Sequence, residues 1–210
     1  MTYVPSSMPQ PSRREATLFA ANIGFGSVVV NVSERFFSSH VPVYIEISED
    51  GATKLRFHIA SRNEMVSALE TNPRALVIVR GPDGYISPRW YDHENVPTWD
   101  YAFVQLEGKV QRLDRSGLKS HVLELLRKFD ADFKVRDEYI EQYLSWIVGF
   151  VIEQPQVEPI FKLSQDKNEA SIQGVTKGLR NRDGCPDKEL AALIEATYSW
   201  ASTLSETNPE

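Results

Sequence analysis

The longest alternating segment of the chain reads YAFVQLEGKVQRL, at residues 101–113. Val104 and Leu106 share one face of an extended chain, whereas Gln105 and Glu107 share the other. Alternation with period two is typical of a β-strand with one face in the core and one face in water. The segment therefore predicts a long, half-buried strand.

Other segments extend this prediction on both sides of the long strand. Runs rich in β-branched residues predict further strands at Ser27–Val32, Val41–Ile47, Leu55–Ala60, Ala75–Val79 and Trp146–Ile152. Helical periods and capping residues predict helices at Ser12–Ile23, Asn63–Glu70, Gly117–Phe129, Asp137–Ser145 and Asp187–Leu204. A meander of strands with helices at its edges predicts an α+β fold.

Composition excludes several classes of protein. The chain has 210 residues, of which 41% are hydrophobic and 25% charged, as in an ordinary globular protein. It carries 23 basic and 29 acidic residues, for a net charge of −6. Proteins that grip nucleic acid normally carry a basic excess, so we do not expect direct nucleic-acid binding.

The chain also lacks the signals of secretion and membrane insertion. Cys185 is the only cysteine, which excludes an intramolecular disulfide. No basic segment followed by an apolar one opens the sequence, and no apolar run approaches the roughly 18 residues of a membrane span. We therefore expect a cytoplasmic protein with no membrane association.

The first candidate for a binding site is the segment from His58 to Asn63, where a strand is predicted to end and a helix to begin. A helix N-terminus presents unpaired amides and a partial positive charge, which suit a phosphate. Ser61 would add a hydroxyl and Arg62 a bidentate cation. The alternative is a simple helix cap beside a solvated arginine.

The second candidate is the aromatic stretch Tyr85–Tyr101, which contains Trp90, Tyr91 and Trp99. Aromatic side chains offer flat apolar walls to a planar ring, and their polar tips can fix its orientation. The alternative is a proline-rich loop that its aromatic side chains pin to the core.

A third candidate is Phe161–Asp166, where Lys162, Ser164 and Gln165 could reach a phosphate, a ribityl hydroxyl or a ring carbonyl. The alternative is a polar loop before a helix.

Neither a dinucleotide-binding glycine pattern nor a P-loop is present. The histidines, at positions 40, 58, 93 and 121, are dispersed in the sequence, so we expect no metal site, although any one of them could ligate haem iron.

Read in order, these segments form a composite pattern. Its parts are Tyr3-Val4-Pro5, His58-x-Ala60-x-Arg62-Asn63, Gly81-Pro82-x-x-Tyr85-Ile86-Ser87-Pro88-x-Trp90-Tyr91, Val96-Pro97-Thr98-Trp99-x-Tyr101, Ile147-Val148-Gly149-Phe150 and Lys162-Leu163-Ser164-Gln165. The pattern resembles the PaiB-type family of FMN-binding negative transcriptional regulators. The resemblance extends from about residue 2 to about residue 180.

The resemblance implies an antiparallel split β-barrel with peripheral helices, related to pyridoxamine-phosphate oxidase, which binds FMN at a homodimer interface. It implies a flavin-binding domain at residues 1–180, followed by a C-terminal helical extension at 181–210. The residues expected to contact the cofactor are His58, Ser61, Arg62, Asn63, Ser87, Trp90, Tyr91, Thr98, Trp99, Lys162, Ser164 and Gln165. FMN is expected rather than FAD, because the phosphate site is short and no fingerprint for an adenylate is present.

Three functions remain open at this stage. The first is an FMN-dependent oxidoreductase with a small-molecule substrate that the sequence does not identify, the second a flavin-binding regulator, and the third a haem-binding or haem-degrading protein.

The chain departs from the family at Asp100 and Asp166, where the family usually has asparagine. Each change replaces an amide donor with an anion, which bears on the choice of ligand.

Overall fold

The computed structural model describes residue 5, residues 7–182 and residues 184–206. Tyr3 and Val4 of the N-terminal motif lie outside the described residues. The helices are α1 (Arg13–Ile23), α2 (Met65–Thr71), α3 (Arg115–Phe129), α4 (Asp137–Tyr143), α5 (Glu169–Asn181) and α6 (Cys185–Glu206), with short 3₁₀ helices η1 (Pro88–Trp90) and η2 (Leu144–Trp146). The strands are β1 (Phe25–Val32), β2 (Arg35–Ile47), β3 (Thr53–Ala60), β4 (Arg74–Ile86), β5 (Thr98–Arg112), β6 (Ile147–Glu153) and β7 (Gln156–Lys162).

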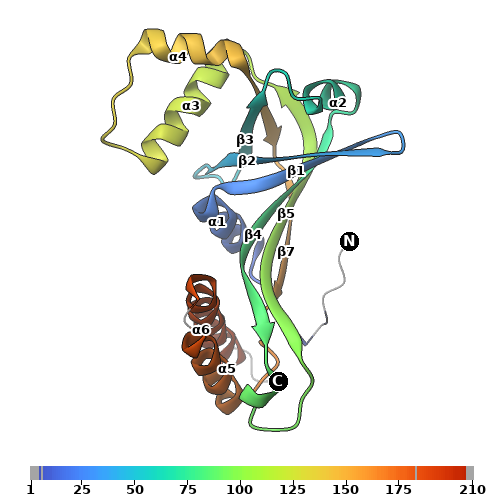
Figure 1. Ribbon diagram of the computed structural model, residues 1–210, viewed down its shortest axis with the longest axis vertical. Coiled ribbons are helices and arrows are strands. Elements are labelled where there is room, and N and C mark those ends of the chain that lie inside the picture. The colour runs from blue at the N-terminus through green and yellow to red at the C-terminus, as the bar shows by residue number, and fades with distance from the viewer. Residues whose placement is uncertain (1–4, 6, 183, 207–210) are drawn as a thin grey trace. The chain divides into compact units, whose positions relative to one another are not determined.

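The strands form one seven-stranded sheet in the order β4-β1-β2-β3-β6-β5-β7, and β4 also pairs with β5 (Figure 1). The pairs β1–β2, β1–β4, β2–β3, β3–β6 and β5–β6 are antiparallel. In β5 the side chains of Ala102, Val104 and Leu106 are fully buried, as the alternation predicts. The expected α+β class with an antiparallel sheet is confirmed.

Contacts within the chain define two compact units. Unit 1 comprises residues 1–12, 81–103 and 159–210, and unit 2 comprises residues 13–80 and 104–158. The strands β4, β5 and β7 contribute residues to both units. No helix in the described part of the chain is long and apolar enough to cross a membrane.

In unit 2, strand β2 changes its pairing partner along its length. Its residues 35–42 pair with β1, from Val32↔Arg35 to Phe25↔Pro42. Its residues 43–47 pair with β3, beginning at Val43↔Phe57. Proline has no amide hydrogen to give to a ladder, and Pro42 stands where the partner changes.

Helix α3 packs close to strand β6 in the same unit. A Cβ at Gly149 of β6 would lie 2.7 Å from a methyl group of Leu118, so only glycine permits this approach without a shift. Leu118 belongs to a buried cluster with Ile140, Leu144 and Ile147. The cluster holds α3, α4 and η2 against one end of β6.

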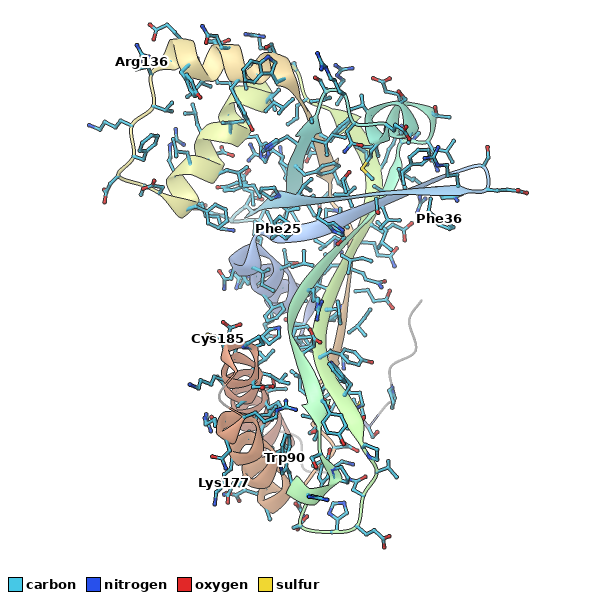
Figure 2. All side chains as sticks on the ribbon, viewed as in Figure 1. Phe25, Phe36, Trp90, Arg136, Lys177 and Cys185 are labelled. Carbon is cyan, nitrogen blue, oxygen red and sulfur yellow. The ribbon has the colours of Figure 1, made fainter. Side chains whose placement is uncertain are left out.

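In unit 1, helices α5 and α6 lie side by side (Figure 1), and Trp90 packs against α5 (Figure 2). A Cβ at Gly178 would lie 2.3 Å from the indole ring, and a Cβ at Gly174, one turn earlier, would lie 2.0 Å from the Trp90 carbonyl oxygen. The guanidinium of Arg182 lies 5.1 Å from the centre of the same ring. Trp90 therefore pins the loop after β4 to helix α5.

Two elements were missing from the sequence prediction. Strand β7 lacks a clear alternation, since Glu158 and Pro159 stand where a regular strand would show apolar and β-branched residues. Helix α5 contains two glycines, which disfavour helices in isolation, yet its buried residues Ile172, Val175 and Leu179 recur with a helical period. The helix is therefore stabilised by the packing of these buried side chains rather than by helix propensity.

The contact of Trp90 with α5 predicts a strong coupling between positions 90 and 178. We expect Gly178→Ala to lower the free energy of unfolding by about 1–3 kcal/mol, because the new methyl group overlaps the indole ring. In a Trp90→Ala background the same substitution should be neutral or stabilising by up to about 1 kcal/mol, since alanine is the better helix former. Urea denaturation followed by circular dichroism measures the four free energies of this cycle. Equal costs of Gly178→Ala in both backgrounds would contradict the packing described.

Candidate functional site

The first candidate site lies in unit 2, where β2 and β3 diverge. The two strands pair only as far as Val43↔Phe57. Beyond this pair, β2 continues beside β1, whereas His58, Ile59 and Ala60 of β3 continue beside β6. The divergence opens a space between the two strands, which we call the fork pocket.

The fork pocket has a volume of about 410 Å³. It is lined by Ser39, His40, Val41, His58, Ile59, Ala60, Asn63, Tyr143 and Ile147. The amide of Asn63 donates a hydrogen bond to Ser39 Oγ at 2.9 Å and so bridges the two arms of the fork. The Ser39 hydroxyl thereby keeps its own hydrogen for a ligand.

A second hollow of about 330 Å³ adjoins the fork pocket at Ala60 and is also lined by Ser61, Arg62 and Trp146. The expectation that a helix N-terminus presents its amides here is wrong, because α2 begins only at Met65. The Ser61 amide donates to the carbonyl of Trp146 at 2.8 Å instead. The exposed guanidinium of Arg62, which has no ion-pair partner among the described residues, lines this hollow and could bind an anion.

His58, which lines the fork pocket, contacts a second imidazole that does not line it. Nδ1 of His58 lies 3.0 Å from Nε2 of His121, a fully buried residue of α3. Burial, followed by the charges of His58 and Arg56, lowers the pKa of His121 to about 3. Burial also lowers the pKa of His58, so both rings are neutral near pH 7.

A third pocket lies within unit 1 and has a volume of about 170 Å³. Its lining, which defines the Lys162 pocket, consists of Met8, Tyr91, Asn95, Val96, Thr98, Asp100, Lys162, Ser164, Asp166 and Lys167. Thus Tyr91, Thr98, Lys162 and Ser164, four of the expected contact residues, come together here.

Asp100 is the centre of this pocket and is fully buried. Its carboxylate accepts from Ser164 Oγ at 2.6 Å and from Lys162 Nζ at 3.3 Å. Lys162 Nζ also donates to Thr98 Oγ1 at 2.6 Å and to the Trp99 carbonyl at 2.9 Å, so its three hydrogens all have acceptors. Burial raises the pKa of Asp100, and the bonds from Ser164 and Lys162 oppose this rise.

Other expected contact residues have structural roles within unit 1. Ser87 Oγ accepts from the Arg89 amide and caps η1, and Trp90 packs on α5 as described above. Trp99 remains about half exposed, with its indole N–H donating to Asp83 at 2.9 Å. Gln165 bonds to the backbone of Leu163 and Phe161 and so shapes the loop after β7.

The expected contact residues therefore divide into two groups. His58, Ser61, Arg62 and Asn63 gather at the fork pocket and its neighbour in unit 2. The remainder belong to unit 1.

Sequence analysis missed several pocket residues. Ser39 and His40 lie in a stretch of β2 without regular alternation, and Tyr143 and Trp146 lie in or beside η2. The sequence did indicate that Asp100 is buried, because position 100 lies on the same face of β5 as the buried positions 102, 104 and 106.

Comparison with known proteins places the chain in a family. Residues 2–154 match the family model described as "Putative FMN-binding domain". The protein named "Protease synthase and sporulation protein PAI 2", from Bacillus subtilis (strain 168), is 30% identical over 200 residues, which cover 92% of this chain and 96% of that protein. An uncharacterized protein of Saccharomyces cerevisiae, YKL070W, is 40% identical over 77 residues, which cover 34% of this chain and 45% of that protein.

Solved structures share the fold at low sequence identity. The FAD and heme binding protein from Mycobacterium smegmatis gives a TM-score of 0.56 at 12% identity, over 73% of this chain and 72% of that one. The flavocytochrome Anf3 from Azotobacter vinelandii gives 0.52 at 14% identity, over 70% and 66%. These likenesses support the expected split-barrel fold. The family model and the Bacillus relative show that this chain belongs to the PaiB-type family of FMN-binding domains.

Proposed function

We propose that the fork pocket and the adjoining Arg62 hollow hold FMN, and that the chain is an FMN-dependent oxidoreductase acting on a small molecule. The observation that carries the proposal is the position of both hollows within residues 2–154, the segment that matches the FMN-binding family.

The donor set of the two hollows fits FMN. Arg62 offers two parallel N–H donors to a phosphate, and the Ser39 hydroxyl and the His58 imidazole offer hydrogen bonds to ribityl hydroxyls or ring carbonyls. Val41 and Ile147 supply apolar surface for a planar ring. This combination of a cation, neutral donors and an apolar wall matches the three chemical parts of the cofactor.

FMN, when bound, supplies hydride and electron transfer, and the protein supplies orientation and electrostatics. Each side chain of the site would have a separate role. Arg62 neutralises phosphate charge, Asn63 fixes the Ser39 hydroxyl across the fork, and Val41 and Ile147 keep water from the ring.

A homodimer completes the site in this proposal. The exposed aromatic ring of Trp146 borders the Arg62 hollow, and that of Trp99 lies at the start of β5. Large exposed aromatic side chains are typical of interfaces. A two-fold interface would bring Trp99 and the loop before β5 of a second copy to each flavin and would make two equivalent sites.

A regulatory role is the second candidate function. It is favoured by the Bacillus relative, which is named for protease synthesis and sporulation and aligns over 92% of this chain. The net charge of −6 speaks against direct contact with DNA. A regulator of this kind would act through the bound flavin.

The proposal predicts that the purified protein carries FMN. Its absorption spectrum should show the two broad bands of oxidised flavin, and heat release followed by chromatography should give FMN. A predominant FAD peak, or a Soret band from haem, would exclude the cofactor proposed.

The oxidoreductase assignment predicts in addition that reduced nicotinamide bleaches the bound flavin faster than it bleaches free FMN, and equal rates would favour the regulatory role.

Arg62→Ala should weaken FMN binding by about one to two decades, because a bidentate charge-assisted contact contributes about 1.5–3 kcal/mol. Arg136→Ala is the matched control: it removes an equal charge from an exposed residue that lies at the start of α4 (Figure 2). Quenching of flavin fluorescence measures both affinities. Equal affinities in the two variants would show that Arg62 does not contact the phosphate.

Trp99→Ala should weaken the dimer and lower flavin occupancy together, because a central interface tryptophan is often worth about 2 kcal/mol, or roughly 30-fold in the dimer dissociation constant. Phe133→Ala is the control, since that ring is exposed to a similar degree, 56% against 51%. Sedimentation monitored at the visible flavin band reports both quantities. A wild type that sediments as a flavin-loaded monomer would refute the dimeric site.

A further inference from the structure

The buried imidazole of His121 does not line the fork pocket. It lies on α3, its side chain is fully buried, and its only hydrogen bond within the described chain is the 3.0 Å contact of its Nε2 with His58 Nδ1. Its other nitrogen, Nδ1, is buried without a partner in the described structure. Buried polar atoms of this kind are rare and call for an explanation.

The N···N contact contains one hydrogen, because both rings are neutral near pH 7. Either His121 donates from Nε2 to His58 Nδ1, or His58 donates from Nδ1 to His121 Nε2. The two arrangements differ at the far nitrogens. In the first, His58 Nε2 carries a hydrogen; in the second, it is a bare acceptor.

The charged groups beside the pair are Arg56 and its two carboxylate partners. Arg56 lies on β3 two residues before His58, and its positive charge acts on His121. The guanidinium is itself held by Glu46 at 2.6 Å and by Glu124 of α3 at 2.7 Å. Its Nε–H is also buried without a partner in the described structure.

A hydrogen on His121 Nδ1 would be a buried donor without an acceptor, whereas a hydrogen on His121 Nε2 meets the lone pair of His58 Nδ1. The unpartnered Nδ1 thus favours the arrangement in which His121 donates from Nε2 to His58 Nδ1. In that arrangement His58 carries its own hydrogen on Nε2.

His58 lines the fork pocket, and no described residue bonds to its Nε2. We propose that His121 is a positioning residue: it fixes the tautomer of His58 so that His58 Nε2–H is a permanent hydrogen-bond donor in the fork pocket, selecting a ligand that presents an acceptor oxygen there. The inference rests on the proposed function in one respect only, since it takes FMN as the ligand that supplies this oxygen.

The tautomer can be observed without any ligand. In protein labelled with ¹⁵N-histidine at about pH 8, where both rings are neutral, two-bond ¹H–¹⁵N correlation spectra separate protonated from unprotonated ring nitrogens. The wild type should show His58 with protonated Nε2 and unprotonated Nδ1. The opposite tautomer, or a rapid mixture of both, would overturn the proposal whether or not the protein binds FMN.

Two variants of His121 test the consequence for binding. His121→Leu removes the donor, so His58 should exchange between tautomers and FMN should bind about three- to tenfold more weakly, the value of one hydrogen bond. His121→Gln keeps an N–H donor and should restore both the tautomer and an affinity within about twofold of wild type. An unchanged affinity in His121→Leu, or no rescue by glutamine, would overturn the positioning role. A wild type that holds the expected tautomer but binds no FMN would refute the proposed function alone.

Discussion

The site depends on the way β2 divides its pairing between two neighbours. Pairing with β1 ends at Pro42, and pairing with β3 begins at Val43. The strand thus leaves one neighbour as it joins the other, and β3 separates from it beyond Phe57. The fork pocket is the space that this separation leaves. Its walls are ladder strands held by backbone hydrogen bonds, so the pocket is formed by the fold itself rather than by mobile loops.

Periodicity predicted most of the fold, and the motif resemblance named His58 and Asn63, which line the fork pocket. Strands such as β1, β3 and β6 were found because their apolar residues follow a regular pattern. The partner change in β2 could not be found in this way, because Phe36 to His40 alternate poorly and pairing is a property of two strands. The position of His121 behind His58 was equally invisible, since 63 residues separate them and only the packing of α3 brings them together.

Asp100 shows how a buried charge is accommodated in this fold. An anion at a core position of β5 would be costly alone, and Lys162 and Ser164 compensate it from the end of β7 and the following loop. Because the ammonium hydrogens of Lys162 are all engaged, this residue is a poor candidate for direct contact with a phosphate. The hydroxyls of Thr98 and Tyr91 also line the Lys162 pocket, and burial raises the pKa of Tyr91, which keeps it protonated.

The double pairing of β2 also limits how the length of the chain can vary. A residue added or lost at the β1–β2 tip, at Ser33 and Glu34, would leave both ladders intact. A residue added or lost between Ser39 and Val43 would shift one ladder against the other by one position, and a shift of one exchanges the two faces of a strand. Either Val41, in the ladder with β1, or Val43, in the ladder with β3, would then turn from the interior toward water. Length variants among related chains should thus be common at the tip of this hairpin and absent from the five residues at the fork.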